Sequence, residues 1–229
     1  MMDISIIAKT SDALNVCYAA ARTCKSPRTP QELMEHAKAT DADEKIRLMK
    51  ALLKARHDSI FEHVSFTFAV SGVSRALLAQ FTRHRIGWSY SVQSQRSVYM
   101  EPVGYKSVEP PTISQYDAAT VGSTLAGFSD RREWNSADAY HRAVAMAYNA
   151  YNVLISCGMP MEDARMVLPI GAPCNITATC NLRAFIDFYR KRVLAKGAQW
   201  EIRAMAERMA ELIMETEPWT AELFEELTE

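Results

Sequence analysis

The segment that decides the fold reads Arg83-His84-Arg85-Ile86-Gly87-Trp88-Ser89-Tyr90-Ser91-Val92-Gln93-Ser94-Gln95-Arg96. It holds three arginines, one histidine, four hydroxyl side chains and two glutamines, and it contains no acidic residue. Guanidinium groups and hydroxyls are the side-chain groups that bind phosphate and the carbonyl edge of a base. The segment therefore predicts an anionic, nucleotide-like ligand.

Composition limits the class of protein around this segment. The chain has 229 residues, of which 48% are hydrophobic, so a single domain over residues 1–229 can bury a core. Lys and Arg number 26 against 27 Asp and Glu, which argues against a general nucleic-acid binder. No apolar run is long enough to span a bilayer, and residues 1–5 do not resemble a signal peptide. We expect a cytoplasmic protein that binds neither membranes nor nucleic acid.

The number and spacing of the cysteines indicate a reducing compartment. Their number is odd, their spacing is irregular, and no CxxC motif is present. This pattern predicts buried free thiols. The five residues are Cys17, Cys24, Cys157, Cys174 and Cys180.

Hydrophobic spacing predicts an α+β domain with more helix than sheet. Strands with alternating apolar residues are expected over 64–70 and 174–180, and a short one over 98–100. Residues 101–132, which are rich in Pro, Gly, Ser and Thr, are expected to form a loop. The last fifteen residues hold six glutamates and no basic residue, which indicates a solvated face or tail. Helices are expected over 11–23, from Thr29-Pro30 onward, and over 41–56, 74–82, 136–157, 160–167, 182–192, 198–216 and 218–227.

A second arginine cluster flanks the predicted helix 182–192. Asn181-Leu182-Arg183 opens it and Arg190-Lys191-Arg192 closes it. Because Arg192 follows Arg183 by nine residues, the two side chains should point to roughly opposite sides and serve different ligands. The alternative, strongest for Arg190 and Lys191, is favourable charge at a helix C-terminus.

Two further clusters have structural alternatives. Arg165 follows Glu162 and Asp163, and an arginine in such a place usually forms a local ion pair. The segment 57–63 has two histidines and two acids, but its spacing fits no zinc pattern, so we predict no metal site. No P-loop, GxGxxG or GxSxG motif is present, so arginines and helix N-termini must hold any phosphate.

Four segments together resemble the flavin-dependent thymidylate synthases. They are His57…Ser59…Phe61-Glu62-His63…Phe66-Thr67-Phe68, Arg83-His84-Arg85…Ser94-Gln95-Arg96, Glu162…Ala164-Arg165…Leu168-Pro169, and Asn181-Leu182-Arg183…Arg192…Ala198-Gln199-Trp200-Glu201-Ile202-Arg203. The resemblance covers about residues 57 to 203. It implies the thymidylate synthase-complementing-protein fold, in which long helices flank a small antiparallel sheet.

The same resemblance implies an activity and an assembly. The protein would be a homotetramer with shared active sites and FAD at its subunit interfaces. It would methylate dUMP to dTMP, with 5,10-methylenetetrahydrofolate as the carbon donor and NADPH as the reductant of the flavin.

Matched residue by residue, the resemblance also implies a set of site residues. The catalytic residue would be Arg192, which would contact the pyrimidine and help to ionise it. The counterpart of Arg165 comes from a neighbouring subunit. FAD would be contacted by His57, Ser59, Glu62, Arg83, His84, Arg85, Ile86, Asn181, Arg183 and Asp187. The nucleotide dUMP would be held by Gln80, Arg83, Ser94, Gln95, Arg96, Arg165 and Arg192.

The chain departs from the family pattern at three places. Eight residues separate Arg85 from Ser94 where seven are usual, and we place the extra one within 86–88. Leu182 stands where alanine is usual. Asp187 stands where asparagine is frequent, and a carboxylate can accept hydrogen bonds from FAD but donate none.

Other chemistries remain as alternatives. A cysteine could add to carbon 6 of uracil, but no cysteine lies in the arginine-rich motifs. Ser94 could act as a nucleophile, but no general base accompanies it, so binding of the dUMP phosphate is preferred. The competing functions are a non-catalytic RNA- or nucleotide-binding module, which would stack bases on the aromatic residues, and a helical oligomeric scaffold.

Overall fold

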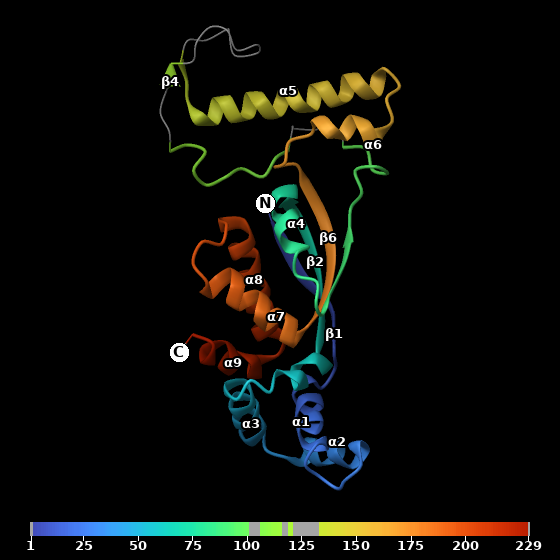
Figure 1. Ribbon diagram of the computed structural model, residues 1–229, viewed down its shortest axis with the longest axis vertical. Coiled ribbons are helices and arrows are strands. Elements are labelled where there is room, and N and C mark those ends of the chain that lie inside the picture. Colours follow the sequence, from blue (N-terminus) through green and yellow to red (C-terminus); the bar gives the residue numbers. More distant parts are fainter. Residues whose placement is uncertain (1, 101–105, 116–118, 121–132, 229) are drawn as a thin grey trace. The chain divides into compact units, whose positions relative to one another are not determined.

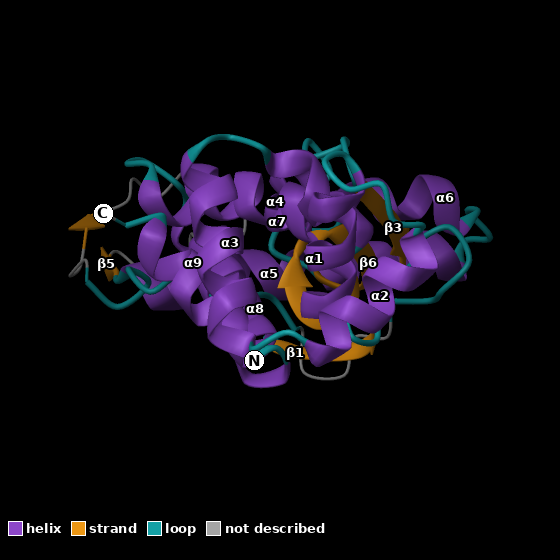
Figure 2. Ribbon diagram, turned by 90° about the horizontal axis from the view of Figure 1, so that it is seen from below, coloured by secondary structure: helices purple, strands orange, loops and turns teal. Residues whose placement is uncertain are grey.

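The computed structural model describes residues 2–100, 106–115, 119–120 and 133–228 (Figure 1). Most of the described elements are helices (Figure 2), and strands form one four-stranded sheet and one small hairpin. The predicted α+β class is confirmed. No helix among the described residues combines the length and the apolar character that crossing a membrane would require.

The main sheet has the strand order β1-β2-β6-β3. Its members are β1 (Asp3–Lys9), β2 (Ser65–Ser74), β6 (Pro173–Asn181) and β3 (Trp88–Val92). β1 runs antiparallel to β2, with Asp3 opposite Ser71 and an irregularity between Ile6 and Ala8. The two inner strands are the predicted ones, whereas β1 and β3 at the edges were not predicted. The strand predicted over 98–100 is wrong, because these residues form no ladder and follow a turn at 95–97.

The inner strands alternate between buried and accessible residues, which explains why their sequences were informative. In the first part of β2 the buried side chains are Phe66, Phe68 and Val70, and the alternation ends before Val73 and Ser74, which are both buried. In β6 they are Cys174, Ile176, Ala178 and Cys180. Burying one face of a pleated strand produces this period of two. The edge strand β1 is mostly exposed and therefore carries no such pattern.

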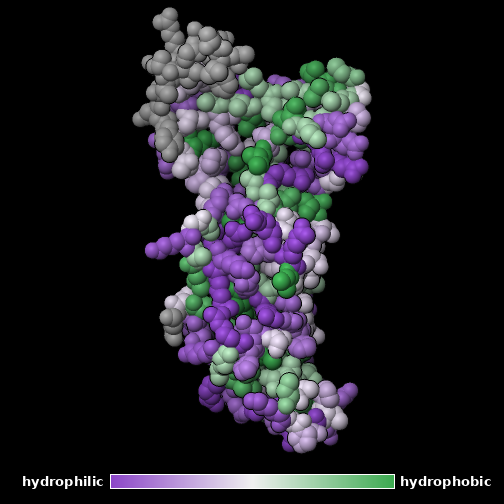
Figure 3. Space-filling model, in the orientation of Figure 1, coloured by the Kyte–Doolittle hydropathy of each residue, from purple (hydrophilic) through white to green (hydrophobic). Residues whose placement is uncertain are grey.

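Helices α7 (Leu182–Tyr189) and α8 (Trp200–Thr216) lie on the same side of strands β1 and β2 in Figure 1. α8 packs against β1. Phe185 and Phe188 of α7 are completely buried. On this face of the molecule, hydrophilic side chains cover much of the surface over these helices (Figure 3). Between the two helices, residues Arg190–Leu194 form a π-helix, η3, where the sequence predicted a continuous α-helix to residue 192.

The N-terminal helices begin where their capping residues predict. α1 spans Ala13–Thr23, α2 spans Pro30–Ala39 and α3 spans Ala42–Lys54. Thr29 and Glu32 form a reciprocal capping box at the start of α2, with Pro30 at the first helical position. The short helix η1 (Asp58–His63) leads from α3 into β2.

The acidic C-terminal segment is packed, so of the two expectations the solvated tail is wrong, whereas a solvated face agrees with the exposed Glu215, Glu222 and Glu225. It contains η4 (Pro218–Thr220) and α9 (Ala221–Glu226). Trp219, Leu223 and Phe224 are buried. The glutamates between these apolar residues face lysines of β1 and α3, in the pairs Glu217 with Lys9, Glu222 with Lys50 and Glu226 with Lys54.

Residue contacts divide the chain into two compact units, described separately below. Unit 1 contains residues 72–78 and 92–175, and unit 2 contains 2–71, 79–91 and 176–229. β2, α4 (Arg75–Phe81) and β6 each begin in one unit and end in the other. That residues 1–229 form one domain stays a prediction.

Unit 1 is built around the long helix α5 (Ser136–Ser156), followed by α6 (Met161–Ala164) and the 3-10 turn η2 (Arg165–Val167). Within the predicted loop 101–132, residues 106–115 form turns and coil, while β4 (Ala119–Thr120) pairs with β5 (Glu133–Trp134). The remainder of that loop lies outside the described residues. Tyr140 and Tyr148 of α5 donate hydrogen bonds to the carbonyls of Val108 and Lys106, at 2.9 and 2.8 Å.

The cysteines divide into two groups. Cys17, Cys174 and Cys180 are buried free thiols, as predicted. Cys24 and Cys157 are free but exposed, so the prediction of burial is wrong for these two, which immediately follow helices α1 and α5.

The turn at Ile86 and Gly87, where we expect the extra residue of the arginine motif, requires glycine. Gly87 has φ +72°, and a Cβ there would lie 2.7 Å from Cβ of Ala184 and 2.9 Å from Nδ2 of Asn181. Ile86 beside it is 94% exposed. The turn therefore projects Ile86 into solvent and packs its glycine against the start of α7.

Gly87→Ala should lower the free energy of unfolding by about 2–4 kcal/mol, because a left-handed backbone and a steric clash add together. Gly197→Ala is the matched control: its φ is +87°, but nothing lies within 4 Å of its added Cβ, so it should cost only about 1–2 kcal/mol. Urea unfolding measures both, and equal losses would show that the clash with α7 does not exist.

Candidate active site

An aromatic cluster in unit 2 fixes the turn that carries Arg83, His84 and Arg85. The ring of Phe81 lies 5.0 Å from Trp88, 4.9 Å from Tyr90 and 5.4 Å from Phe188, measured between centroids. The Tyr90 hydroxyl shares its hydrogen between the carbonyls of Phe81 and His84, at 3.0 and 2.7 Å. Burial raises the pKa of Tyr90, so the hydroxyl remains a donor at neutral pH. Both ends of the turn are thereby fixed.

The side chain of His84 binds Arg192. Nε of Arg192 donates to Nε2 of His84 at 3.0 Å, and Nη2 donates to the carbonyl of Gln80 at 3.3 Å. The His84 ring also packs edge-on against Phe188, at 4.8 Å. Burial and the charge of Arg192 lower the pKa of His84 to about 4. His84 is therefore neutral at physiological pH and accepts a hydrogen bond from the guanidinium.

Three arginines near this turn have no carboxylate partner. Arg83, Arg85 and Arg192 take part in none of the ion pairs between described residues, and Arg83 and Arg85 are exposed. Burial, and then the positive charge of Arg83, lower the pKa of Arg192. Uncompensated guanidinium groups this close to one another create a site for an anion.

Other residues predicted to contact FAD already have partners in unit 2. Arg183 forms a close ion pair with Glu62, and Lys191 pairs with Asp187 at 2.7 Å. Asn181 caps α7, since its Oδ1 accepts from the amide of Ala184 at 2.8 Å. His57 and Ser59 are exposed at the start of η1. As predicted, Arg183 and Arg192 reach different neighbours.

The remaining predicted residues lie in unit 1, where Glu162 binds two of them. Arg96 binds Oε2 of Glu162 through Nε and Nη2, both at 2.9 Å, and Arg165 Nε donates to the Glu162 carbonyl at 3.0 Å. The Ser94 hydroxyl accepts from the amide of Arg96 at 3.2 Å. Gln95 is 8% exposed, and its Nε2 has no hydrogen-bond partner.

The local ion pair expected for Arg165 does not occur among the described residues. Its Nε donates instead to the backbone carbonyl of Glu162. Arg96 and Arg165 are neighbours within one chain. A neighbouring subunit that supplies one of them would therefore supply the other as well.

Three residues that organise these groups were not among the predicted site residues. Glu162 holds the two arginines of unit 1, Tyr90 closes the turn in unit 2, and Phe188 supports His84. Of the three, only Tyr90 lies inside the arginine-rich segment, so the sequence could have indicated its role. The other two act through contacts that no local spacing reveals.

No group of three or more His, Cys, Asp or Glu side chains among the described residues could hold a metal ion. In particular, the segment 57–63 does not form such a group.

His84→Gln should flatten the pH dependence of stability, because glutamine keeps an acceptor for Arg192 but does not titrate. The pKa of His84 falls from 6.5 to about 4 on folding, so between these values the unfolded chain binds a proton that the folded chain does not. Stability of the native chain should therefore decrease as the pH is lowered through that window.

Urea unfolding between about pH 4 and pH 7 measures the effect in the native chain, in His84→Gln and in the surface control His63→Gln. An unchanged slope in His84→Gln would contradict the buried, neutral histidine.

Comparison with known proteins now identifies the family. Residues 5–219 match a family model described as thymidylate synthase complementing protein. The flavin-dependent thymidylate synthase of Haloarcula marismortui is 35% identical over 98% of this chain and 96% of its own length. That of Geobacter sulfurreducens is 35% identical over 95% of this chain and 84% of its own length. A crystal structure of the UMP/dUMP methylase PolB from Streptomyces cacaoi, bound with 5-Br dUMP, has a TM-score of 0.73 and 25% identity, and covers 98% of this chain and 94% of that one. The chain belongs to the flavin-dependent thymidylate synthase family.

Proposed function

We propose that this protein methylates dUMP to dTMP, with 5,10-methylenetetrahydrofolate as the carbon donor and NADPH as the reductant. The main support for this proposal is the way in which the guanidinium of Arg192 is held. Its guanidinium is fixed along one edge by His84 and Gln80, and no carboxylate of a described residue pairs with it. Such a group is prepared to bind an anion in a fixed orientation.

The proposed catalytic role of Arg192 follows from this arrangement. Carbon 5 of uracil must become electron-rich before it can accept a carbon unit. A guanidinium held against the pyrimidine would stabilise the ring anion without reorganising during the reaction. His84 is a positioning residue in this scheme, because it reaches the substrate only through Arg192.

The chain's residues fit FAD as a bound group. Arg83 and Arg85 leave the turn without carboxylate partners among the described residues and are available for the phosphates of a dinucleotide. His57, Ser59, Glu62, His84, Ile86, Asn181, Arg183 and Asp187 would complete the FAD-binding set. When bound, FAD would supply the hydride that NADPH provides. Because Nε2 of His84 is engaged with Arg192, a contact from His84 to FAD would use the rest of its ring.

The proposed dUMP-binding set has members in each of the two separately described units. Gln80, Arg83 and Arg192 belong to unit 2, and Ser94, Gln95, Arg96 and Arg165 to unit 1. The Arg96–Glu162 pair does not exclude phosphate binding by Arg96. Its side chains are 62% and 50% exposed, and such surface pairs contribute only about 0–1 kcal/mol, so a phosphate can compete.

Two nucleophilic alternatives find little support. Burial raises the pKa of Cys180 and raises that of Cys17 to about 12, which disfavours a reactive thiolate at either. Ser94 Oγ has only the Arg96 amide as a hydrogen-bond partner among the described residues, with no base to activate it. Binding the phosphate remains the better assignment for Ser94.

The assembly and the location stay predictions. A homotetramer with shared active sites, and a cytoplasmic protein without metal, are what the family resemblance and the composition lead us to expect.

The purified chain, supplied with FAD, should convert dUMP to dTMP in the presence of methylenetetrahydrofolate and NADPH, because each component provides a different part of the product. Chromatographic detection of dTMP measures this, and omission of any one component should abolish it. Salt-sensitive binding of oligonucleotides by a chain that takes up no flavin and forms no dTMP would favour the nucleotide-binding module instead.

Arg192→Ala should reduce turnover by about 100- to 1000-fold, as expected when one preorganised charge stabiliser is removed. Affinity for FAD, measured by quenching of flavin fluorescence, should change far less. The control is Arg208→Ala on α8, whose guanidinium pairs with Glu211 and Glu215 on the surface. Equal losses of turnover and FAD affinity in Arg192→Ala would refute a role in ionising the pyrimidine.

A further inference from the structure

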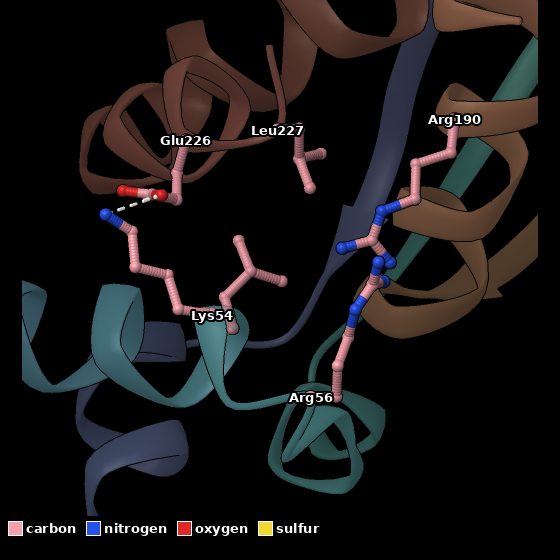
Figure 4. A pocket seen from close by; sticks show the side chains of 6 residues that line it. Lys54, Arg56, Arg190, Glu226 and Leu227 are labelled. Carbon is pink, nitrogen blue, oxygen red and sulfur yellow. Dashed lines mark ion pairs between the residues drawn. The ribbon is translucent and has the colours of Figure 1, made fainter. Parts of the chain in front are cut away.

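A small basic pocket in unit 2 has no part in the proposed reaction. It has a volume of about 170 Å³ and lies between the C-terminal end of α3, the start of η3 and the end of α9 (Figure 4). Its lining residues are Leu53, Lys54, Arg56, Arg190, Glu226 and Leu227. None of these was predicted to contact FAD or dUMP.

The charges around the pocket are unbalanced. Lys54 is neutralised by Glu226 at 2.8 Å. The guanidinium groups of Arg56 and Arg190 point toward one another in Figure 4. Arg56 takes part in no ion pair with a described carboxylate, and the nearest one to Arg190 is Asp58, at 4.0 Å. Two cations thus converge with little compensation from the protein.

The backbone shows that Arg56 stands at an unusual position for an arginine. It follows Ala55, the C-terminal cap of α3, and has φ +59°, a left-handed conformation that glycine adopts most easily. The amides of Arg56 and His57 bind the carbonyls of Leu53 and Leu52, at 3.1 and 2.9 Å, which closes the helix end. Glycine would close the helix with less strain. The presence of arginine at this position is therefore explained by its side chain and not by its backbone.

The environment of Arg190 makes the pair costly when the pocket is empty. Burial is the main cause that lowers the pKa of Arg190, followed by the positive charge of Arg56, and the charges of Asp58 and Asp187 offset this only in part. An oxyanion between the two guanidinium groups would accept hydrogen bonds from both and remove their repulsion.

We propose that the pocket formed by Arg56 and Arg190 binds a phosphate-class oxyanion. Its volume corresponds to about five or six water molecules at roughly 30 Å³ each, which admits a phosphate group but not a whole nucleotide. The anion is therefore free phosphate, or the phosphate monoester of a larger ligand whose remainder stays outside. All residues that line the pocket belong to unit 2, whereas Ser94 and Arg96 belong to unit 1.

Calorimetric titration of the full chain with inorganic phosphate at constant ionic strength tests the proposal. Because the region of Arg96 would bind phosphate too, the titration uses Arg96→Gln as its background. That chain, saturated with FAD so that Arg83 and Arg85 are occupied, should still bind one phosphate saturably. Adding Arg56→Gly or Arg190→Gln should weaken this binding at least about tenfold, since each removes one charged pair of donors.

The choice of variants separates binding from folding. Arg56→Gly removes the guanidinium but suits the left-handed backbone, so it should not destabilise the chain. Arg208→Gln, also added to the Arg96→Gln chain, is the control for loss of a positive charge elsewhere in unit 2 and should leave the affinity unchanged.

Competition distinguishes the two sources of the anion. NADPH, which carries a 2′-phosphate, should displace the bound phosphate where NADH does not, if the monoester is the ligand. If neither displaces it, the ligand is free phosphate. The proposal is wrong if the Arg96→Gln chain shows no saturable phosphate binding, or if Arg56→Gly and Arg190→Gln bind phosphate as tightly as Arg208→Gln. None of these measurements depends on dTMP formation, so they stand apart from the test of the proposed function.

Discussion

The packing of Phe81 against Trp88, Tyr90 and Phe188 is the constraint on which the site in unit 2 depends. These rings join the end of α4, strand β3 and helix α7. The turn of Arg83 to Arg85 is thereby enclosed between fixed ends, and His84 is placed against α7, where it meets Arg192. A polar motif can present its charges reproducibly because an apolar core holds its backbone.

The sequence predicted those parts of the fold in which local pattern and tertiary burial agree. Apolar and polar residues alternate in the inner strands β2 and β6 because one face of each strand is buried. Helix α2 starts directly after Thr29, because this residue and Glu32 form the capping box within four residues of sequence. The edge strand β1 has one buried residue in seven, so nothing in its pattern distinguishes it from a loop. The C-terminal glutamates were misjudged because their lysine partners are distant in the sequence, 208 residues away for Lys9 and Glu217.

The candidate site was predicted mainly through family resemblance, and the structure adds relations between its residues. The spacing of nine residues between Arg183 and Arg192 did indicate different neighbours. It could not indicate that His84 accepts from Arg192, since this bond joins positions 108 residues apart. Nor could the acidic sequence around Arg165 show that the backbone of Glu162, and not its carboxylate, is the acceptor.

The partners of the arginines now separate two kinds of role. Arg208 is neutralised by glutamates on its own helix, and Arg183 by Glu62, so their charges are compensated within the chain. Arg83, Arg192 and Arg56 have no carboxylate partner among the described residues. Guanidinium groups that lie close together repel one another, and an anion between them removes that repulsion. We therefore propose that these three arginines bind ligands because of the neighbours they have, and not because of the number of arginines in a motif.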